Sequence, residues 1–168
     1  RAEWGVEAQS AATGGTITTC GNCKIHSFTG PGTFCVSQVH PCAANNEVSY
    51  MVVAGGGGGI AQGGAGGAGG FREDKSPITP YTASPLDGAG PITVTATGYP
   101  ITVGGGGGPG TIGSNSVFST STSAGGGNAV KTPSNATGAA GGSGAGGSSP
   151  PSGPTGPAGS GNTPPVSP

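Results

Sequence analysis

The chain passes directly from a β-prone run into five glycines at Tyr50-Met51-Val52-Val53-Ala54-Gly55-Gly56-Gly57-Gly58-Gly59. The same step recurs at Tyr99-Pro100-Ile101-Thr102-Val103-Gly104-Gly105-Gly106-Gly107-Gly108. Glycine opposes α-helix by about 1 kcal/mol per residue relative to alanine, and it brings no side chain to a core. The two runs therefore predict strands that lead into extended glycine segments.

Composition extends this prediction to the whole chain. The 168 residues include 40 glycines and 16 prolines, about a third of the total, with a single methionine and a single leucine, so good helix formers are nearly absent. Five basic and six acidic residues leave a net charge of −1, which is not the strong charge of a typical disordered chain. We expect essentially no α-helix after residue 20.

Charge and hydropathy also restrict the partners. The five basic residues form no patch that could follow a phosphate backbone, so we expect no nucleic-acid binding. No apolar run approaches the roughly 18 residues of a membrane span. The chain begins with Arg1 and no apolar leader, which is consistent with a processed product or a fragment.

Three regions follow one another along the chain. Residues 1–19 are expected to be a connector, and residues 20–130 a domain of β-hairpins and glycine tracts. Within it, residues 24–28 and 33–37 predict a hairpin around the turn Thr29-Gly30-Pro31-Gly32. Further strands are expected at residues 47–53, 91–95, 99–103 and 116–119, and residues 131–168 form a Gly/Pro/Ser-rich tail.

Glycines in the tail and tracts recur at every third position, the repeat of a polyproline-II-type helix. Such helices make no internal hydrogen bonds, but bare glycine faces let neighbouring backbones pair. Ordering a residue costs roughly 1–2 kcal/mol and a hydrogen bond returns about 0.5–1.5 kcal/mol, so a lone glycine strand should stay disordered. We expect tail order only against other chains; the alternatives are packing on the same chain, a flexible linker, or a short collagen-like run. The predicted lattice-forming residues are Gly57, Gly66, Gly69, Gly106, Gly126, Gly141, Gly144 and Gly147, and valine at Gly57 or Gly106 should disrupt folding.

The order of these elements, from about residue 16 to residue 130, resembles the glycine-rich domain of bacteriophage tail-fibre proteins and tail-tip adhesins. The segments that carry the resemblance are residues 28–34, 48–59, 66–73, 99–108, 116–118 and 125–127. The resemblance implies glycine tracts packed as polyglycine-II helices, and joining loops that read a host-surface receptor. The four cysteines and the long tail depart from the family pattern.

The cysteines have the spacing C-x2-C-x11-C-x6-C. Its second pair is too widely spaced for an ordinary zinc knuckle, so we expect no metal. In a hairpin centred on Pro31, Cys20 faces Cys42, and Cys23 lies on the same face as Cys35 but out of register. These positions predict two disulfides in an oxidising, extracellular setting. Reduced thiols in a particle assembled in the cytosol are the alternative.

Candidate recognition residues concentrate in a charged stretch at residues 71–75. A loop on a rigid scaffold is a typical recognition site, although charges there can also block edge-to-edge association. The expected receptor contacts are Arg72, Glu73, Asp74, Lys75, Tyr81, Leu86 and Tyr99; the last three could instead cap the glycine layer. His26 and His40 are expected to be surface residues, and the tract at residues 55–59 lacks the following helix that a phosphate-binding loop needs.

The expected fold class is mostly β and irregular, with short β-hairpins, packed polyglycine-II/PPII-type helices and almost no α-helix. The expected function is a structural or adhesive component of an extracellular fibre, a bacteriophage tail fibre or adhesin segment that attaches to a host surface. The alternative is a self-assembling subunit of an extracellular filament or sheath without a specific receptor. We expect no enzymatic activity and no cofactor. The expected partners are copies of the chain and other fibre proteins, with a host-surface glycan or an outer-membrane protein as the receptor.

Overall fold

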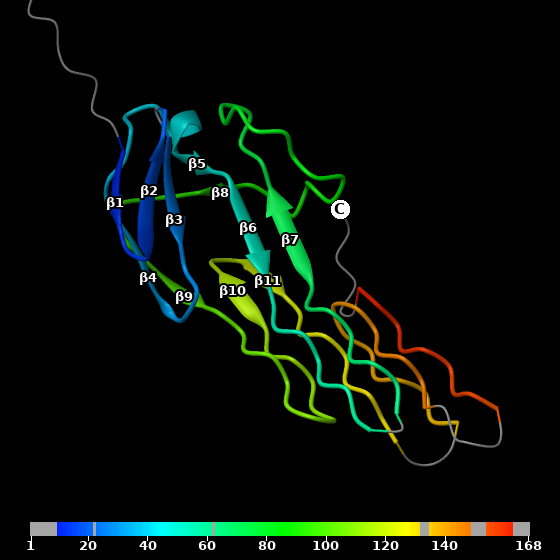
Figure 1. The fold of residues 1–168 in the computed structure, drawn as a ribbon. Helices are drawn as coiled ribbons and strands as arrows, with labels where there is room; N and C mark the ends of the chain where they lie inside the picture. The colour runs from blue at the N-terminus through cyan, green and yellow to red at the C-terminus, as the bar shows by residue number, and fades with distance from the viewer. Residues whose placement is uncertain (1–9, 22, 62, 132–134, 149–153, 163–168) are drawn as a thin grey trace, which may run out of the picture.

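Two regions of different chemistry meet end to end in the computed structural model, which describes residues 10–21, 23–61, 63–131, 135–148 and 154–162. One region, which we call the β head, holds the strands. The other, which we call the glycine lattice, holds the glycine tracts and the described part of the tail (Figure 1). The described residues contain one four-residue 3₁₀ turn, η1 (Ala43–Asn46), and no α-helix, so the fold class predicted from the sequence is confirmed.

The β head is built from eleven short strands in the described residues. They are β1 (Ala11–Thr13), β2 (Thr16–Cys20), β3 (Cys23–Ser27), β4 (Gly32–Gln38), β5 (Glu47–Val48), β6 (Tyr50–Val53), β7 (Phe71–Asp74), β8 (Ile92–Thr93), β9 (Gly98–Thr102), β10 (Ser116–Phe118) and β11 (Ser121–Ser123). Five of them form an antiparallel sheet in the order β1-β4-β9-β10-β11, and the others pair as β2-β3, β5-β8 and β6-β7.

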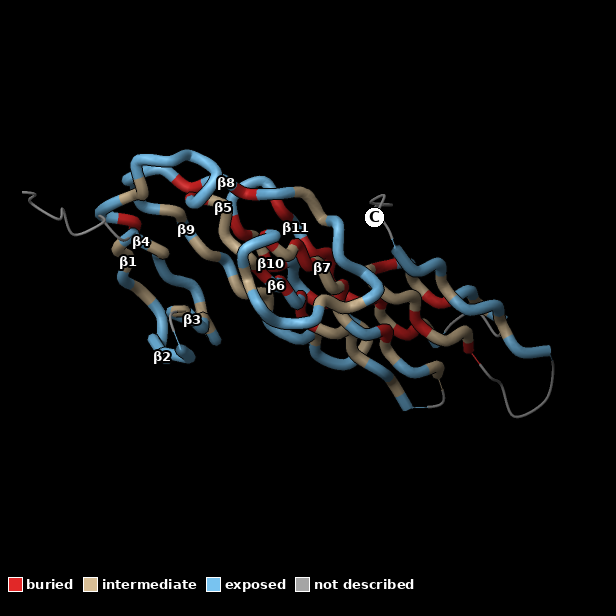
Figure 2. The backbone as a smooth tube through the Cα atoms, turned by 90° about the horizontal axis from the view of Figure 1, so that it is seen from above, coloured by how far each residue is buried: buried red, intermediate tan, exposed pale blue. Residues whose placement is uncertain are grey.

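A small aromatic core holds the β head together. Phe118 is its centre, with ring centroids 5.6 Å from Tyr50, 6.1 Å from Phe34 and 6.2 Å from Tyr99. All three contacts are edge-to-face, a favourable geometry for aromatic pairs. The aliphatic members of the core are Val36, Val52, Ile92 and Val94. Buried residues run through the middle of the molecule and on into the glycine lattice (Figure 2).

The hairpin predicted around Pro31 does not form. β3 pairs with β2, and β4 pairs with β1 and β9. The reason is a shorter closure: Gly21 has φ +57°, a conformation that glycine adopts without strain, and only two residues separate β2 from β3. Residues 11–19, expected as a connector, therefore form β1 and most of β2.

The charged stretch 71–75 is also not a loop, because its first four residues form β7. β7 pairs antiparallel with β6, from Tyr50 opposite Asp74 to Val53 opposite Phe71. The predicted strands at 47–53, 91–95, 99–103 and 116–119 coincide with β5 and β6, β8, β9 and β10. β1, β2, β7 and β11 were not predicted from the sequence.

Two strand pairs, β6–β7 and β9–β10, continue into the glycine lattice, and the register of each pair is kept. Beyond the β6–β7 pair, the amide of Ala54 donates to the carbonyl of Gly70 (3.0 Å) and that of Gly57 to Gly67 (2.8 Å). Beyond the β9–β10 pair, the amide of Ser114 donates to the carbonyl of Gly105 (3.0 Å). Along one glycine segment, the amides that donate to the same neighbouring segment recur every three residues, whereas in a β-strand they recur every two. This spacing marks the change from a β-strand to a three-residue-per-turn helix.

Segment 54–58 shows this threefold arrangement most completely. Its amides at residues 54 and 57 donate to segment 63–70, and those at residues 55 and 58 donate to segment 111–115. Its carbonyls at residues 55 and 58 accept from segment 124–130, and that of Gly56 accepts from Gly107. One extended segment is therefore hydrogen-bonded to four neighbouring segments through its backbone alone.

At most of the predicted lattice-forming positions, there is no room for a side chain, so glycine is required. A Cβ atom would overlap a backbone carbonyl or amide of a neighbouring segment at Gly57, Gly66, Gly69, Gly126, Gly141, Gly144 and Gly147. Gly106 is the exception: a Cβ there would lie 3.7 Å from the Gly56 carbonyl oxygen, an ordinary contact. The prediction that Gly106 needs to be bare is therefore wrong, and the neighbouring positions Gly104 and Gly107 carry that requirement in this segment.

The tail packs against its own chain, so the expectation that it orders only between chains is wrong for the described residues. Ser143 donates its amide to the carbonyl of Ala68 (3.0 Å), Gly146 to Ala65 (2.9 Å) and Gly142 to Gly125 (2.8 Å). Segment 154–161 adds an outer layer, with the Gly159 amide 2.7 Å from the Ala145 carbonyl. Residues 63–70 and 124–130 offer the bare faces that a second chain would otherwise have to supply.

A matched pair of alanine substitutions tests the steric basis of the lattice. In Gly57→Ala the new methyl group overlaps the carbonyl of Gly127, and we expect a loss of about 1–3 kcal/mol or more in unfolding free energy. In Gly105→Ala nothing lies within 4 Å of the methyl group, and we expect no loss, or a gain of up to about 1 kcal/mol from reduced unfolded-state entropy. Denaturant unfolding monitored by circular dichroism measures both. Equal stability of the two variants would contradict the lattice.

A truncation tests the packing of the tail against its own chain. Removal of residues 131–168 takes away the donors to the carbonyls of Ala65, Ala68 and Gly125, each worth roughly 0.5–1.5 kcal/mol. We expect the truncated monomer to melt at a lower temperature in calorimetry. Removal of residues 163–168 alone, which spares these bonds, is the control. An unchanged melting temperature after the longer truncation would contradict intramolecular packing.

Candidate functional site

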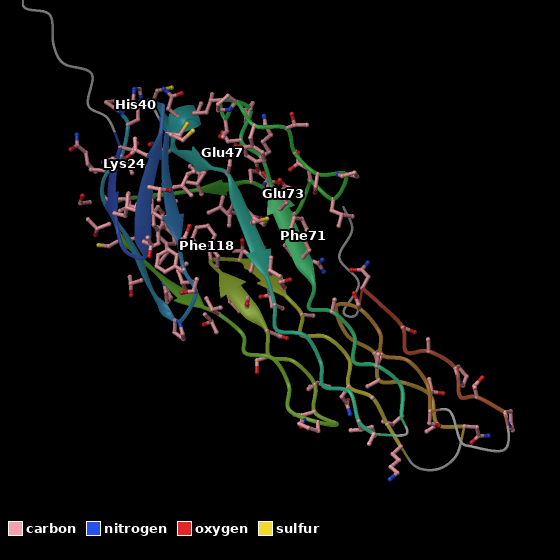
Figure 3. All side chains as sticks on the ribbon, in the orientation of Figure 1. Lys24, His40, Glu47, Phe71, Glu73 and Phe118 are labelled. Atoms are coloured by element: carbon pink, nitrogen blue, oxygen red, sulfur yellow. The ribbon has the colours of Figure 1, made fainter. Side chains whose placement is uncertain are left out.

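A loop of residues 75–90 leaves the end of β7 farthest from the glycine lattice and returns into β8 (Figure 1). Three prolines, Pro77, Pro80 and Pro85, restrict its backbone. Side chains crowd the β head and become sparse along the lattice, and Glu73 lies near the end of β7 from which the loop starts (Figure 3). The loop is therefore a place where side chains can gather on an otherwise side-chain-poor molecule.

Three carboxylates tie this loop down by accepting hydrogen bonds from backbone amides. Asp87 Oδ1 accepts from the amide of Lys75 at 2.8 Å, and Glu73 Oε2 accepts from the amide of Ser84 at 3.0 Å. Asp74 Oδ2 accepts from the amide of Gly90 at 2.8 Å. Because hydrogen bonds to a charged acceptor are stronger than neutral ones, these contacts fix the start, the middle and the end of the loop.

Neutral hydrogen bonds complete the anchorage. The carbonyl of Glu73 accepts from the amides of Gly88 (3.2 Å) and Ala89 (2.9 Å). Ser49, between β5 and β6, accepts from the amide of Ser76 at 2.9 Å, and its hydroxyl lies 2.6 Å from that of Thr79. These contacts join the loop to β7 and to the residue that precedes β6, so the sheet pairing and the loop conformation depend on each other.

Hydrogen bonding and burial shift two pKa values at the base of the loop. Hydrogen bonding by Ser84 holds the pKa of Glu73 below its ordinary value. Burial raises the pKa of Tyr81, and the neighbouring Glu73 adds to this effect. The Lys75 ammonium group lies 5.8 Å from the centre of the Tyr81 ring, within the range of a cation–π contact. Glu73, Lys75 and Tyr81 thus form one coupled cluster at the base of the loop.

Two of the predicted contact residues are buried, and this corrects their assigned role. Glu73 is 5% exposed and Asp74 is 8% exposed, because their carboxylates point into the anchorage described above. They position the loop and cannot offer their side chains to a partner. Tyr99 is half-buried in the aromatic core, where its hydroxyl accepts from the amide of Thr95 at 2.8 Å.

The other predicted contacts lie nearer the surface. Arg72 is half-buried and donates to the carbonyl of Phe71 (2.7 Å) and to the side chain of Asn162 (3.3 Å), so it joins β7 to the tail. Tyr81 and Leu86 project from the loop and are 39% and 60% exposed. Ile78, 62% exposed, was missed by the sequence analysis, although an isoleucine between prolines in a polar stretch could have indicated it.

The two histidines, expected at the surface, are both half-buried. The His26 ring lies 2.9 Å from the Gly14 carbonyl oxygen through Nδ1 and packs edge-on against Phe34 at 5.0 Å. His40 Nδ1 accepts from the amide of Cys42 at 2.9 Å. Both rings therefore support local backbone structure.

The predicted disulfide pairs are not brought together. All four cysteines are free, and the β2–β3 register places Cys20 opposite Cys23 instead of Cys42. Among the described residues, no group of three or more His, Cys, Asp or Glu side chains could hold a metal ion. In the same part of the chain, no helix has the length and apolarity needed to cross a membrane.

Comparison with known proteins identifies the family. The family model described as a glycine-rich domain matches residues 28–164, which cover most of both the β head and the glycine lattice. The chain therefore belongs to the glycine-rich domain family. No curated protein and no solved structure matches it.

The lowered pKa of Glu73 predicts acid-sensitive anchorage of the loop. A carboxylate whose pKa is depressed in the folded state stabilises that state fully above its ordinary value, here 4.5, and loses this contribution as the pH falls through the folded pKa. We expect the Ser84 amide to lose protection from hydrogen exchange, corrected for intrinsic rates, as the pH falls below about 4.5 and through the folded pKa of Glu73. Glu73→Gln should weaken this dependence, and Glu47→Gln, in β5, is the control. Equal pH profiles of the three proteins would contradict this role of Glu73.

Proposed function

We propose that this member of the glycine-rich domain family is a non-enzymatic, structural and adhesive component of an extracellular fibre. The proposed setting is a bacteriophage tail fibre or adhesin segment, located at the virion surface, that attaches to the host. The observation that carries the proposal is the loop of residues 75–90, which exposes Ile78, Tyr81 and Leu86 while three carboxylates hold its backbone in place.

Preorganisation makes this loop suitable for adhesion. Binding by a flexible loop loses affinity because side chains and backbone must be ordered at the moment of contact. Here the ordering cost is met in folding, through the hydrogen bonds of Glu73, Asp74 and Asp87. Exposed apolar and aromatic side chains on a fixed backbone suit a host-surface glycan, against which Tyr81 can stack, or an outer-membrane protein.

The glycine lattice is a suitable stalk for such a loop. Its segments are cross-linked by backbone hydrogen bonds to as many as four neighbours, so force on one segment is shared by the others. The sequence resemblance to tail-fibre and tail-tip proteins supports the same setting. Attachment to a surface under mechanical load requires a stiff body and a defined contact loop, and this chain combines the two.

Substitutions in the loop test adhesion separately from folding. We expect Tyr81→Ala and Leu86→Ala to reduce binding of the purified, labelled chain to a panel of isolated bacterial outer membranes, by about tenfold for an anchor residue worth roughly 1.4 kcal/mol. Ile112→Ala is the matched control, because Ile112 is 58% exposed but lies in the glycine lattice. Unfolding midpoints should be unchanged in all three variants. Equal loss of binding in the control, or no loss in either loop variant, would contradict the proposal.

One observation favours a second candidate, a self-assembling subunit of an extracellular filament or sheath. Gly105 and Gly108 face solvent, and nothing in the chain lies within 4 Å of a Cβ atom at either position. On another outer segment, the solvent-facing positions carry alanine instead, at Ala65 and Ala68. A bare face that the monomer does not need can accept a glycine segment of a second copy.

Electron microscopy of the purified chain separates the two candidates. Filaments that disappear in Gly105→Val, with no binding to outer membranes, would favour the second candidate. Dispersed particles that bind outer membranes through the loop would favour the first.

A further inference from the structure

The hairpin β2–β3 brings two thiols into direct opposition at its tip. Cys20 is the last residue of β2 and Cys23 the first residue of β3, and they are cross-strand partners in the antiparallel register. Directly opposed residues of an antiparallel pair project to the same side of the sheet. Both thiols therefore lie on one face, and two residues separate them in the sequence.

The spacing of such a pair suits a disulfide. Opposed residues in an antiparallel ladder have Cα atoms about 4.5–5.5 Å apart, and disulfides join Cα atoms that are about 4.4–6.8 Å apart. Cys20 is exposed and Cys23 is half-buried, so a small oxidant can reach the pair. No rearrangement of the backbone register is needed for the bond to form.

The other two cysteines lack this relationship. Cys35 in β4 is opposed by Thr13 on one edge and by Gly98 on the other. Cys42 precedes η1 and lies outside the strands. Among the described residues, Cys20 and Cys23 are thus the one pair of thiols that the sheet register brings face to face.

We propose that Cys20 and Cys23 form a disulfide within the hairpin when the chain meets oxidising surroundings. The oxidant is a low-molecular-weight disulfide such as oxidised glutathione. The thiolate of one cysteine attacks it, forming a mixed disulfide and releasing one small thiol. The second cysteine then displaces the other small thiol, so the two thiol protons and two electrons of the protein pass to the two released thiols.

The β2–β3 hairpin is a segment that a disulfide at its tip would stabilise. Every residue of β2 is exposed, β2 and β3 form a sheet of two strands only, and two-stranded hairpins are marginally stable in water. A bridge at the tip holds the register and limits fraying. Because the closed loop is very short, little effect on global unfolding is expected, and the change is confined to this hairpin.

Peptide mapping provides a direct test, because trypsin separates the two cysteine pairs. The basic residues are Arg1, Lys24, Arg72, Lys75 and Lys131, so Cys20 and Cys23 fall in peptide 2–24, and Cys35 and Cys42 fall in peptide 25–72. The native full chain is treated with oxidised glutathione, denatured, alkylated with iodoacetamide, and digested without reduction at mildly acidic pH. We expect peptide 2–24 to lose two hydrogen atoms and carry no alkyl group, while peptide 25–72 carries two alkyl groups.

Other mass patterns would overturn the proposal. They are peptide 2–24 with two alkyl groups, peptide 2–24 with two attached glutathiones, and peptide 2–24 linked to peptide 25–72. The double variant Cys35→Ser/Cys42→Ser should form the same bridge. The variant Cys20→Ser should not, and its Cys23 should be recovered alkylated or glutathionylated.

Hydrogen exchange supplies a second readout that does not depend on adhesion. Amides of residues 16–27 should exchange more slowly after oxidation and return to the original rate after reduction, whereas in Cys20→Ser they should not respond. Unchanged exchange in the oxidised parent would overturn the proposed hold on the hairpin. The inference concerns the hairpin alone, so it stands or fails separately from the proposed adhesive function.

Discussion

Direct contact between backbones is the interaction on which this structure depends. Where segments 54–60, 63–70 and 124–130 touch, carbonyl oxygens and amides occupy the space in which other residues place a Cβ atom. The contact satisfies hydrogen bonds that a three-residue-per-turn helix cannot make internally. An isolated segment would not offset its ordering entropy, but a segment that bonds several neighbours at once gains a bond for most of the residues it fixes. This dependence also explains why the tail folds back onto the lattice, where bare faces are already arranged.

The glycine segments cannot select their own register, because strands without side chains specify pairing only weakly. The β head supplies that information. The β6–β7 and β9–β10 pairs are held by an aromatic core around Phe118. Each pair continues into two segments of the glycine lattice in the same register. Side chains therefore set the alignment in one half of the molecule, and the backbone propagates it through the other half. The sequence shows this division at Val53-Ala54-Gly55 and again at Thr102-Val103-Gly104.

Local patterns predicted the elements better than their partners. Most of the strands, the glycine segments and the near absence of helix could be predicted, because each depends on residues within one window. The partner of β3 was predicted wrongly because the Thr29–Gly32 turn looked like the closure, while Gly21 offered a shorter one. The charges at residues 71–75 suggested an exposed loop, yet Glu73 and Asp74 are buried acceptors for amides more than ten residues away. Which glycines must be bare depends on neighbours distant in sequence, and this is why Gly106 was misjudged while Gly57 was not.

The separation of lattice and loop has a consequence for how such a protein can vary. The loop of residues 75–90 is held by Glu73 and Asp74 at the end of β7, by Asp87 within the loop, and by Ser49 beside β6. None of these contacts involves a glycine that the lattice requires. The exposed side chains of Ile78, Tyr81 and Leu86 can therefore change without altering the packing of the segments below them, provided that the carboxylate anchors are kept. Under the proposed adhesive function, the stability of the stalk would reside in its backbone and the specificity of the contact loop in a few side chains. Substitution at the loop alone would then be enough to bind a new surface.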